Sequence, residues 1–191
     1  TANVVEKKNR SAWIKAGIAV EATSAAQVAE QAGLNWTVGL SEMHTSDFLH
    51  VPKKQAVVKT HQGKESVIGV VGSKYKVFQN SEVFGSLDGL IDSGQARYAA
   101  AGEYDDGAKV WMLMSLPREM EIKGDPHAAF LLAKTTHDGS GSVLIRPIIE
   151  RLFCHNQINK IYRATDKKRT YMLRHTTNSK LDVNDVRGIL D

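Results

Sequence analysis

The chain has 191 residues, of which 42% are hydrophobic and 24% are charged. This is the composition of an ordinary globular protein, so it excludes wholesale disorder and predicts one α+β domain over residues 1–191. No apolar run approaches the ~20 residues of a bilayer span, and the single Cys154 excludes an intrachain disulfide framework. We therefore expect a cytoplasmic protein that contacts no membrane, with a trimmed start because no initiator Met is present.

Positive charge is concentrated in one part of the chain. The net charge is only +4, but residues 146–180 hold nine Lys and Arg against two acidic residues. Because neutralising phosphates releases counterions, such a segment indicates a protein that binds a polyanion. A solvated face without a partner is the alternative interpretation.

The first elements are a helix and a strand. Ser24 followed by Gln27 is typical of a capping box, and Gly33 supplies a stop, so the pattern predicts a helix over about 24–32. Alternation at Trp36, Val38 and Leu40 predicts a strand. Residues 41–54 show no sustained period and are expected to form a loop.

A hairpin and a helix follow. The β-branched runs 55–60 and 65–71 flank a short connection that contains Gly63, which predicts an antiparallel hairpin. Apolar residues at helical spacing, among them Phe84, Leu87 and Ile91, predict a helix over about 81–92. The order is therefore β-β-β-α.

Two further hairpins complete the sheet. Strands are expected near 96–103 and 108–116, joined through Asp105-Asp106-Gly107, and near 128–136 and 143–153. Helices are expected near 156–164 and from about Asp182. The predicted fold is α+β, an antiparallel sheet of hairpins with flanking helices, with its core in 24–153 and a basic C-terminal part in 154–191.

The sequence lacks the residue patterns that several kinds of catalysis require. Gly63-Lys64 has neither the upstream glycine nor the following hydroxyl of a phosphate loop, so ATP use is not expected. Cys154 and His155 are neighbours and cannot form a nucleophile–base pair on a strand. The His and Cys residues have no paired metal-ligand spacing. We expect no cofactor and no bound metal. One alternative stays open, a metal-dependent nuclease whose carboxylates and lysine are Asp105, Asp106, Glu121 and Lys123.

Six stretches, in order, resemble the phage/plasmid-like family of uncharacterised proteins. They are AGLNWTV at 32–38, VVGSKYKVFQN at 70–80, YAAAGEYDDGAKVWMLMSLP at 98–117, LLAKTTHDGSGSVLIRP at 131–147, FCHNQIN at 153–159 and LRHT at 173–176. The resemblance implies a phage or plasmid protein in a bacterial host cell, and it implies no activity. Members commonly continue further beyond LRHT, so a C-terminal segment is expected to be missing.

The β-β-β-α order is also similar to the core of single-strand annealing proteins, the class of the phage lambda beta protein. That resemblance implies a non-enzymatic protein that binds and anneals single-stranded DNA in homologous recombination without ATP, as a ring or filament of identical subunits. A phage protein that binds a host factor is a further alternative.

The candidate contacts are cations interleaved with flat side chains, because sequence-tolerant binding of a single strand needs both. For Tyr75, an anchoring role in the core is the alternative. The candidates are Lys74, Tyr75, Lys76, Arg146, Arg151, Asn156, Lys160, Arg163, Lys167, Lys168, Arg169, Tyr171 and Arg174.

Overall fold

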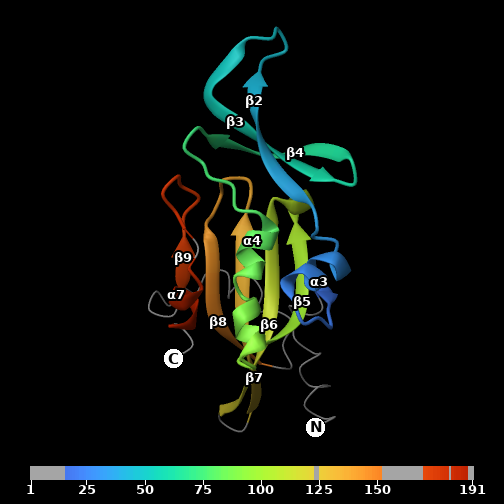
Figure 1. The fold of residues 1–191 in the computed structure, drawn as a ribbon, viewed down its shortest axis with the longest axis vertical. Coiled ribbons are helices and arrows are strands. Elements are labelled where there is room, and N and C mark those ends of the chain that lie inside the picture. The colour runs from blue at the N-terminus through green and yellow to red at the C-terminus, as the bar shows by residue number, and fades with distance from the viewer. Residues whose placement is uncertain (1–15, 123–124, 152–169, 181, 189–191) are drawn as a thin grey trace.

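The computed structural model describes residues 16–122, 125–151, 170–180 and 182–188. In this part of the chain the strands form two antiparallel sheets, one of six strands and one of three, and the helices are short. Figure 1 shows the larger sheet as the body of the molecule, with the three-stranded sheet standing on one of its ends. The predicted α+β fold class is confirmed.

The larger sheet is built mainly from consecutive hairpins, with strand order β1-β5-β6-β7-β8-β9. The two predicted hairpins, β5 with β6 and β7 with β8, are confirmed, although β6 and β7 are longer than expected. The two edge strands, β1 and β9, are short and were not predicted. The strands are β1 (Ile18–Ala19), β5 (Arg97–Tyr104), β6 (Lys109–Ile122), β7 (Asp125–Thr136), β8 (Val143–Arg151) and β9 (Tyr171–Leu173).

One face of this sheet is covered by α3 (Ala25–Gln31), α4 (Asn80–Gly85) and α5 (Asp88–Asp92). Val28, Phe84 and Leu87 from the helical layer are fully buried in one cluster with alternate residues of the strands, such as Met112 and Leu131. The intervening residues, including Trp111 and Phe130, form a second buried cluster on the opposite face. The sheet is therefore apolar on both sides.

The expected helix over 81–92 is divided into α4 and α5. Gly85 and Ser86 are weak helix formers, and the Ser86 hydroxyl donates to the Val83 carbonyl. The chain tightens at this point, where Leu87 donates to the Phe84 carbonyl three residues back. The buried positions Phe84 and Leu87 were predicted correctly, whereas Ile91 is only partly buried.

The smaller sheet contains β2 (Thr37–His44), β3 (His50–His61) and β4 (Lys64–Gly72), with β3 in the middle. The predicted antiparallel hairpin of β3 and β4 is confirmed, and Gln62 and Gly63 form its turn with φ of 50° and 76°. The prediction that 41–54 is a loop was wrong. Polar residues occupy both faces of this stretch, so it shows no alternation although most of it is strand.

The predicted N-terminal helix is α3. Ser24 caps it as expected, but the Gln27 side chain accepts from the Thr23 amide instead of the Ser24 amide.

Two more helices were predicted near the C-terminus. The helix expected from Asp182 is α7 (Val183–Arg187), capped by the Asp182 side chain. The helix expected at 156–164 lies outside the described residues. Within the described part of the chain, no helix is both long and apolar enough to cross a membrane.

Candidate functional site

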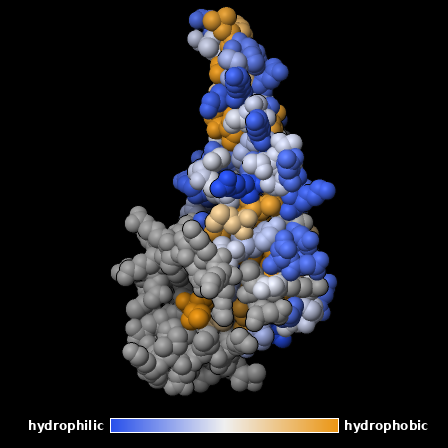
Figure 2. Space-filling view, turned by 90° about the vertical axis from the view of Figure 1, so that its left-hand side faces the viewer, coloured by the Kyte–Doolittle hydropathy of each residue, from blue (hydrophilic) through white to orange (hydrophobic). Residues whose placement is uncertain are grey.

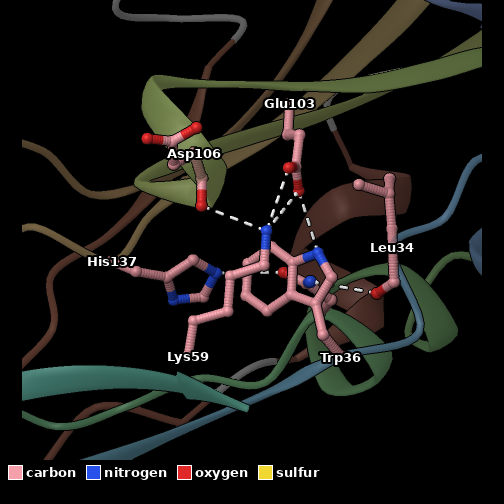
Figure 3. Close-up of polar contacts among 7 residues, drawn as sticks. Leu34, Trp36, Lys59, Glu103, Asp106 and His137 are labelled. Atoms are coloured by element: carbon pink, nitrogen blue, oxygen red, sulfur yellow. Dashed lines mark hydrogen bonds and ion pairs between the residues drawn. The ribbon is translucent and has the colours of Figure 1, made fainter. Parts of the chain in front are cut away.

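A partly buried polar cluster lies where the three-stranded sheet meets the end of the larger sheet (Figure 3). We call it the junction and define it as Trp36, Lys59, Asn80, Glu103 and His137. These residues come from separate places in the chain: the approach to β2, strand β3, the first turn of α4, strand β5 and the turn after β7. The junction therefore forms only when both sheets and α4 are in place.

A Lys59–Glu103 ion pair joins the two sheets. The Lys59 ammonium lies 2.9 Å from one carboxylate oxygen of Glu103 and also donates to the Asp106 carbonyl at 3.0 Å. The Trp36 indole donates to the second carboxylate oxygen at 2.8 Å, and the ammonium lies 4.4 Å from the centroid of the Trp36 ring. Carboxylate, carbonyl and ring face together satisfy a cation whose side chain is only 12% exposed.

His137 is the other polar core of the junction. Its Nε2 lies 3.0 Å from Asn80 Oδ1. Since the Asn80 amide group donates to the Leu34 carbonyl, Oδ1 must accept, and Nε2 carries the proton. Burial lowers the pKa of His137 to about 4, with the nearby His175 and Lys59 lowering it further and Asp138 opposing them. The imidazole is therefore neutral at pH 7, with a buried Nδ1 that has no hydrogen-bond partner among the described residues.

The β5–β6 turn has an unusual backbone where it meets Lys59. Asp105, Asp106 and Gly107 have φ of 53°, 55° and 100°, so three consecutive residues are left-handed. A Cβ on Gly107 would lie 2.8 Å from the Lys59 ammonium and 2.9 Å from the Trp36 ring. Because Gly107 has no side chain, the backbone of the turn can approach the ion pair closely.

Two further contacts hold the smaller sheet in place. The Gln79 side chain accepts from the Val38 amide at 3.0 Å and donates to the Val38 carbonyl at 2.8 Å, so it pairs with the edge of β2 as a strand residue does. Gly69 of β4 lies against the 138–139 turn, where a Cβ would come within 2.5 Å of Asp138 Cα. Asp138 accepts from the amide and hydroxyl of Ser140, so its carboxylate stabilises this turn.

The second candidate site is a surface where two distant segments of the chain run side by side. Tyr75 and Thr176 form an antiparallel bridge, and next to it Lys76 donates its amide to the His175 carbonyl. The Lys76 ammonium donates to the Ser179 carbonyl at 2.7 Å. We call the cations of these two segments the basic strip; its members are Lys74, Lys76, Arg174 and Lys180, of which all but Lys76 are exposed.

The comparisons with known proteins identify a family without an assigned activity. A family model described as a domain of unknown function (DUF932) matches residues 67–191. The chain belongs to the DUF932 family. No curated protein and no solved structure matches it.

The DUF932 match begins inside β4, so the junction draws on both sides of the family boundary. Asn80, Glu103 and His137 lie within the matched residues, whereas Trp36 and Lys59 precede them. The six stretches that resemble the phage/plasmid-like family supply Trp36, Asn80, Glu103 and His137. Among the described residues, no group of three His, Cys, Asp or Glu is placed to hold a metal ion.

The two candidate tyrosines are held by structural contacts. The Tyr75 ring stacks on His175 with centroids 4.9 Å apart and an interplanar angle of 4°, and its hydroxyl donates to the Thr136 carbonyl. Burial, with a smaller effect of Asp138, raises the pKa of this hydroxyl. Tyr75 thus anchors its loop, as the alternative interpretation held. Tyr171 is partly exposed on β9, and its hydroxyl donates to the Lys180 carbonyl.

The other candidates have different surroundings. Arg146 is only 6% exposed on β8, so a strand bound at the surface would not meet it. Lys74, Lys76 and Arg174 belong to the basic strip. Arg151 ends β8, but its side chain is outside the described part of the chain. Also outside it are Asn156, Lys160, Arg163, Lys167, Lys168 and Arg169.

The carboxylate cluster of the alternative nuclease is not formed. Asp105 and Asp106 lie just before β6, whereas Glu121 lies at its far end. At about 3.3 Å per residue, this strand separates them by roughly 40 Å. Asp105 instead pairs with the Lys109 ammonium, and Lys123 lies outside the described residues. Both aspartates belong to the hairpin turn, which was the other role considered for them.

The residue pairs of the junction could not be predicted from the sequence. Lys59 and Glu103 are separated by 44 residues, and nothing in their local patterns links them. The β2–β3 turn was also missed, although its signal is visible in the sequence. Phe48-Leu49 is an apolar pair inside an otherwise polar stretch, and such a pair needs either a core or a partner.

Proposed function

We propose that this DUF932 protein is a non-enzymatic single-stranded DNA-binding and annealing protein of a phage or plasmid, acting in recombination without ATP. The observation that carries the proposal is the basic strip. Two segments a hundred residues apart come together at an antiparallel bridge, and three of the four cations on them, Lys74, Arg174 and Lys180, are exposed. Exposed cations on neighbouring segments suit the phosphates of one strand.

Two exposed cations flank the bridge. Lys74 directly precedes Tyr75, and Arg174 is two residues before Thr176, so the bridge brings both onto neighbouring segments. The Lys76 ammonium is bound to the Ser179 carbonyl between these segments. The candidate lysines and arginines of 160–169 belong to the proposal by their charge in the sequence.

The junction has a structural role. Its lysine is paired with a carboxylate, and its histidine is neutral and fully buried. A general acid or base must reach the substrate. Assembly into rings or filaments of identical subunits belongs to the proposal by resemblance to annealing proteins.

The test is a titration of a labelled 20-nucleotide single strand with the protein at two salt concentrations, with and without magnesium. The variant Lys74→Ala/Arg174→Ala should bind more weakly whatever the base sequence, because phosphate contacts carry no base information. Its log–log salt slope should be smaller by about 1.4, since each contact to a single strand contributes about 0.7. The control variant is Arg97→Ala, which removes an exposed charge on β5, three strands away from β8. It should leave the affinity and the salt slope unchanged.

The other outcomes separate the alternatives. Cleavage of the strand in magnesium would support a nuclease in place of the proposal. Absence of binding at low salt would leave a phage protein that binds a host factor. Equal affinity and equal slope for the folded double variant and the parent would remove the basic strip as the binding surface.

A further inference from the structure

The distal end of the β2–β3 hairpin forms an arm, which we define as residues 42–54. It reaches beyond the end of β4, because β4 pairs with β3 only from Lys54 onward. Figure 2 shows this arm as the narrow free end of the molecule, with hydrophobic colour at its tip and mixed hydrophilic and hydrophobic colour below it. Every residue from 44 to 50 is exposed, so the tip adds nothing to the core.

The tip presents the aromatic side chain of Phe48 in an unfavourable way, both in its exposure to solvent and in its backbone conformation. Phe48 is 88% exposed, and its φ of 60° places a bulky residue in the left-handed region. The left-handed φ closes the 45–49 turn, but the exposure of the ring serves no core, since neither buried cluster includes a residue of 42–54. A strained backbone around an exposed functional group is typical of binding sites.

The turn is nevertheless well built. The Thr45 amide donates to the Leu49 carbonyl, the Leu49 amide donates to the Thr45 hydroxyl, and the Phe48 amide donates to the Thr45 carbonyl. Directly below, the rings of His44 and His50 meet edge to face at 5.6 Å. Phe48 is therefore held outward by a hydrogen-bonded turn on an aromatic base.

The root of the arm is continuous with the basic strip. Lys53 and Lys54 are both exposed in a bulge where the ladder skips from His44–His50 to Glu42–Gln55. Lys54 lies opposite Gly72, and Lys74 stands in the turn that the Tyr75 amide closes to the Gly72 carbonyl. The stem of the arm therefore carries cations next to the segment that leads into the strip. At about 3.3 Å per residue, Lys54 is roughly 20 Å from Phe48 along the chain.

We propose that the 45–49 turn is a base-stacking platform, on which Phe48 receives a nucleobase of a single strand whose phosphates follow Lys53, Lys54 and the basic strip. This inference rests on the proposed function and adds to it a residue on which a base stacks. An aromatic ring accepts any base, because every base has a π-face, so the contact is sequence-tolerant.

The experiment compares two 20-nucleotide strands of equal charge, oligothymidylate and the same backbone without bases. Phe48→Ala should weaken binding of oligothymidylate roughly 5- to 150-fold, the equivalent of one stacked base, without changing the salt slope. It should leave binding of the abasic strand unchanged. Phe48→Tyr should restore affinity, and Val67→Ala, which truncates a 64% exposed side chain on β4, serves as the matched control.

Each result decides the matter. Unchanged binding of oligothymidylate by Phe48→Ala, or equal weakening on both strands, would overturn the platform while leaving the basic strip intact. Failure of the parent to bind either strand would overturn the proposed function and the platform with it. A shift in molar mass by light scattering for Phe48→Ala without DNA would assign the tip to contacts between copies of the chain, which also overturns the proposal.

Discussion

Acid should destabilise this fold through His137. In the folded protein its pKa is lowered from 6.5 to about 4, chiefly by burial. Between these two values the unfolded chain binds a proton that the folded chain does not, so the stability present above pH 6.5 is lost as pH falls toward 4. Lowering pH from 7 to 5 should reduce the free energy of unfolding by about 2 kcal/mol from this one group, and the full effect is about 3 kcal/mol below pH 4.

The matched variant is His137→Gln. The Gln amide nitrogen can replace Nε2 as the donor to Asn80 Oδ1, but it does not titrate. The groups that face His137 are Lys59, His175 and Asp138, and all of them are retained. The difference in pH dependence between parent and variant therefore isolates the imidazole.

The assay is urea unfolding followed by tryptophan fluorescence, because Trp36 contacts the His137 ring edge to face at 5.3 Å. We expect the parent's unfolding midpoint to fall more steeply between pH 7 and pH 5 than that of His137→Gln. Parallel curves for the two proteins would refute the reasoning, since they would mean that His137 titrates equally in the folded and unfolded chains.

Three further predictions concern packing and the junction. Leu87→Ala should lower the free energy of unfolding by about 2–5 kcal/mol in urea titrations, because the side chain is fully buried between the helices and the sheet. Lys59→Met should cost about 1–3 kcal/mol by leaving the partly buried Glu103 carboxylate without its cation, and adding Glu103→Gln should recover part of this loss in a double-mutant cycle. Gly107→Ala should lower the thermal midpoint more than Gly63→Ala, because both residues have positive φ but only the Cβ at 107 meets the ion pair.

The fold was predictable where short-range patterns dominate. The β3–β4 hairpin, the β5–β6 and β7–β8 hairpins and the capped start of α3 follow from local alternation and turn chemistry. The arm was missed because a strand exposed on both faces carries no alternation. The edge strands β1 and β9 were missed because strands of two and three residues are defined by their partners and not by their own pattern.

The candidate site was predictable only in its parts. The Lys74–Lys76 loop and the segment around Arg174 were chosen separately for their charge, and their bridge at Tyr75 is a tertiary contact that no local pattern encodes. Tyr75 illustrates the limit. Its residue type fits either base stacking or anchoring, and only the stacked His175 and the hydrogen bond to Thr136 decide for anchoring.

Several of the stretches that resemble the phage/plasmid-like family contribute residues to the junction, and the structure explains why. Trp36, Glu103 and His137 come from three such stretches and meet in one buried cluster that ties the root of the smaller sheet to the larger one. A cluster of this kind fixes an angle between two sheets, because each partner lies on a different element and a buried polar group without its partner is costly. The arm is the distal part of the smaller sheet, whereas the basic strip lies in the 74–76 loop and the 174–180 segment. The residues that hold the joint therefore fix how the smaller sheet, and Phe48 with it, stands against the larger sheet.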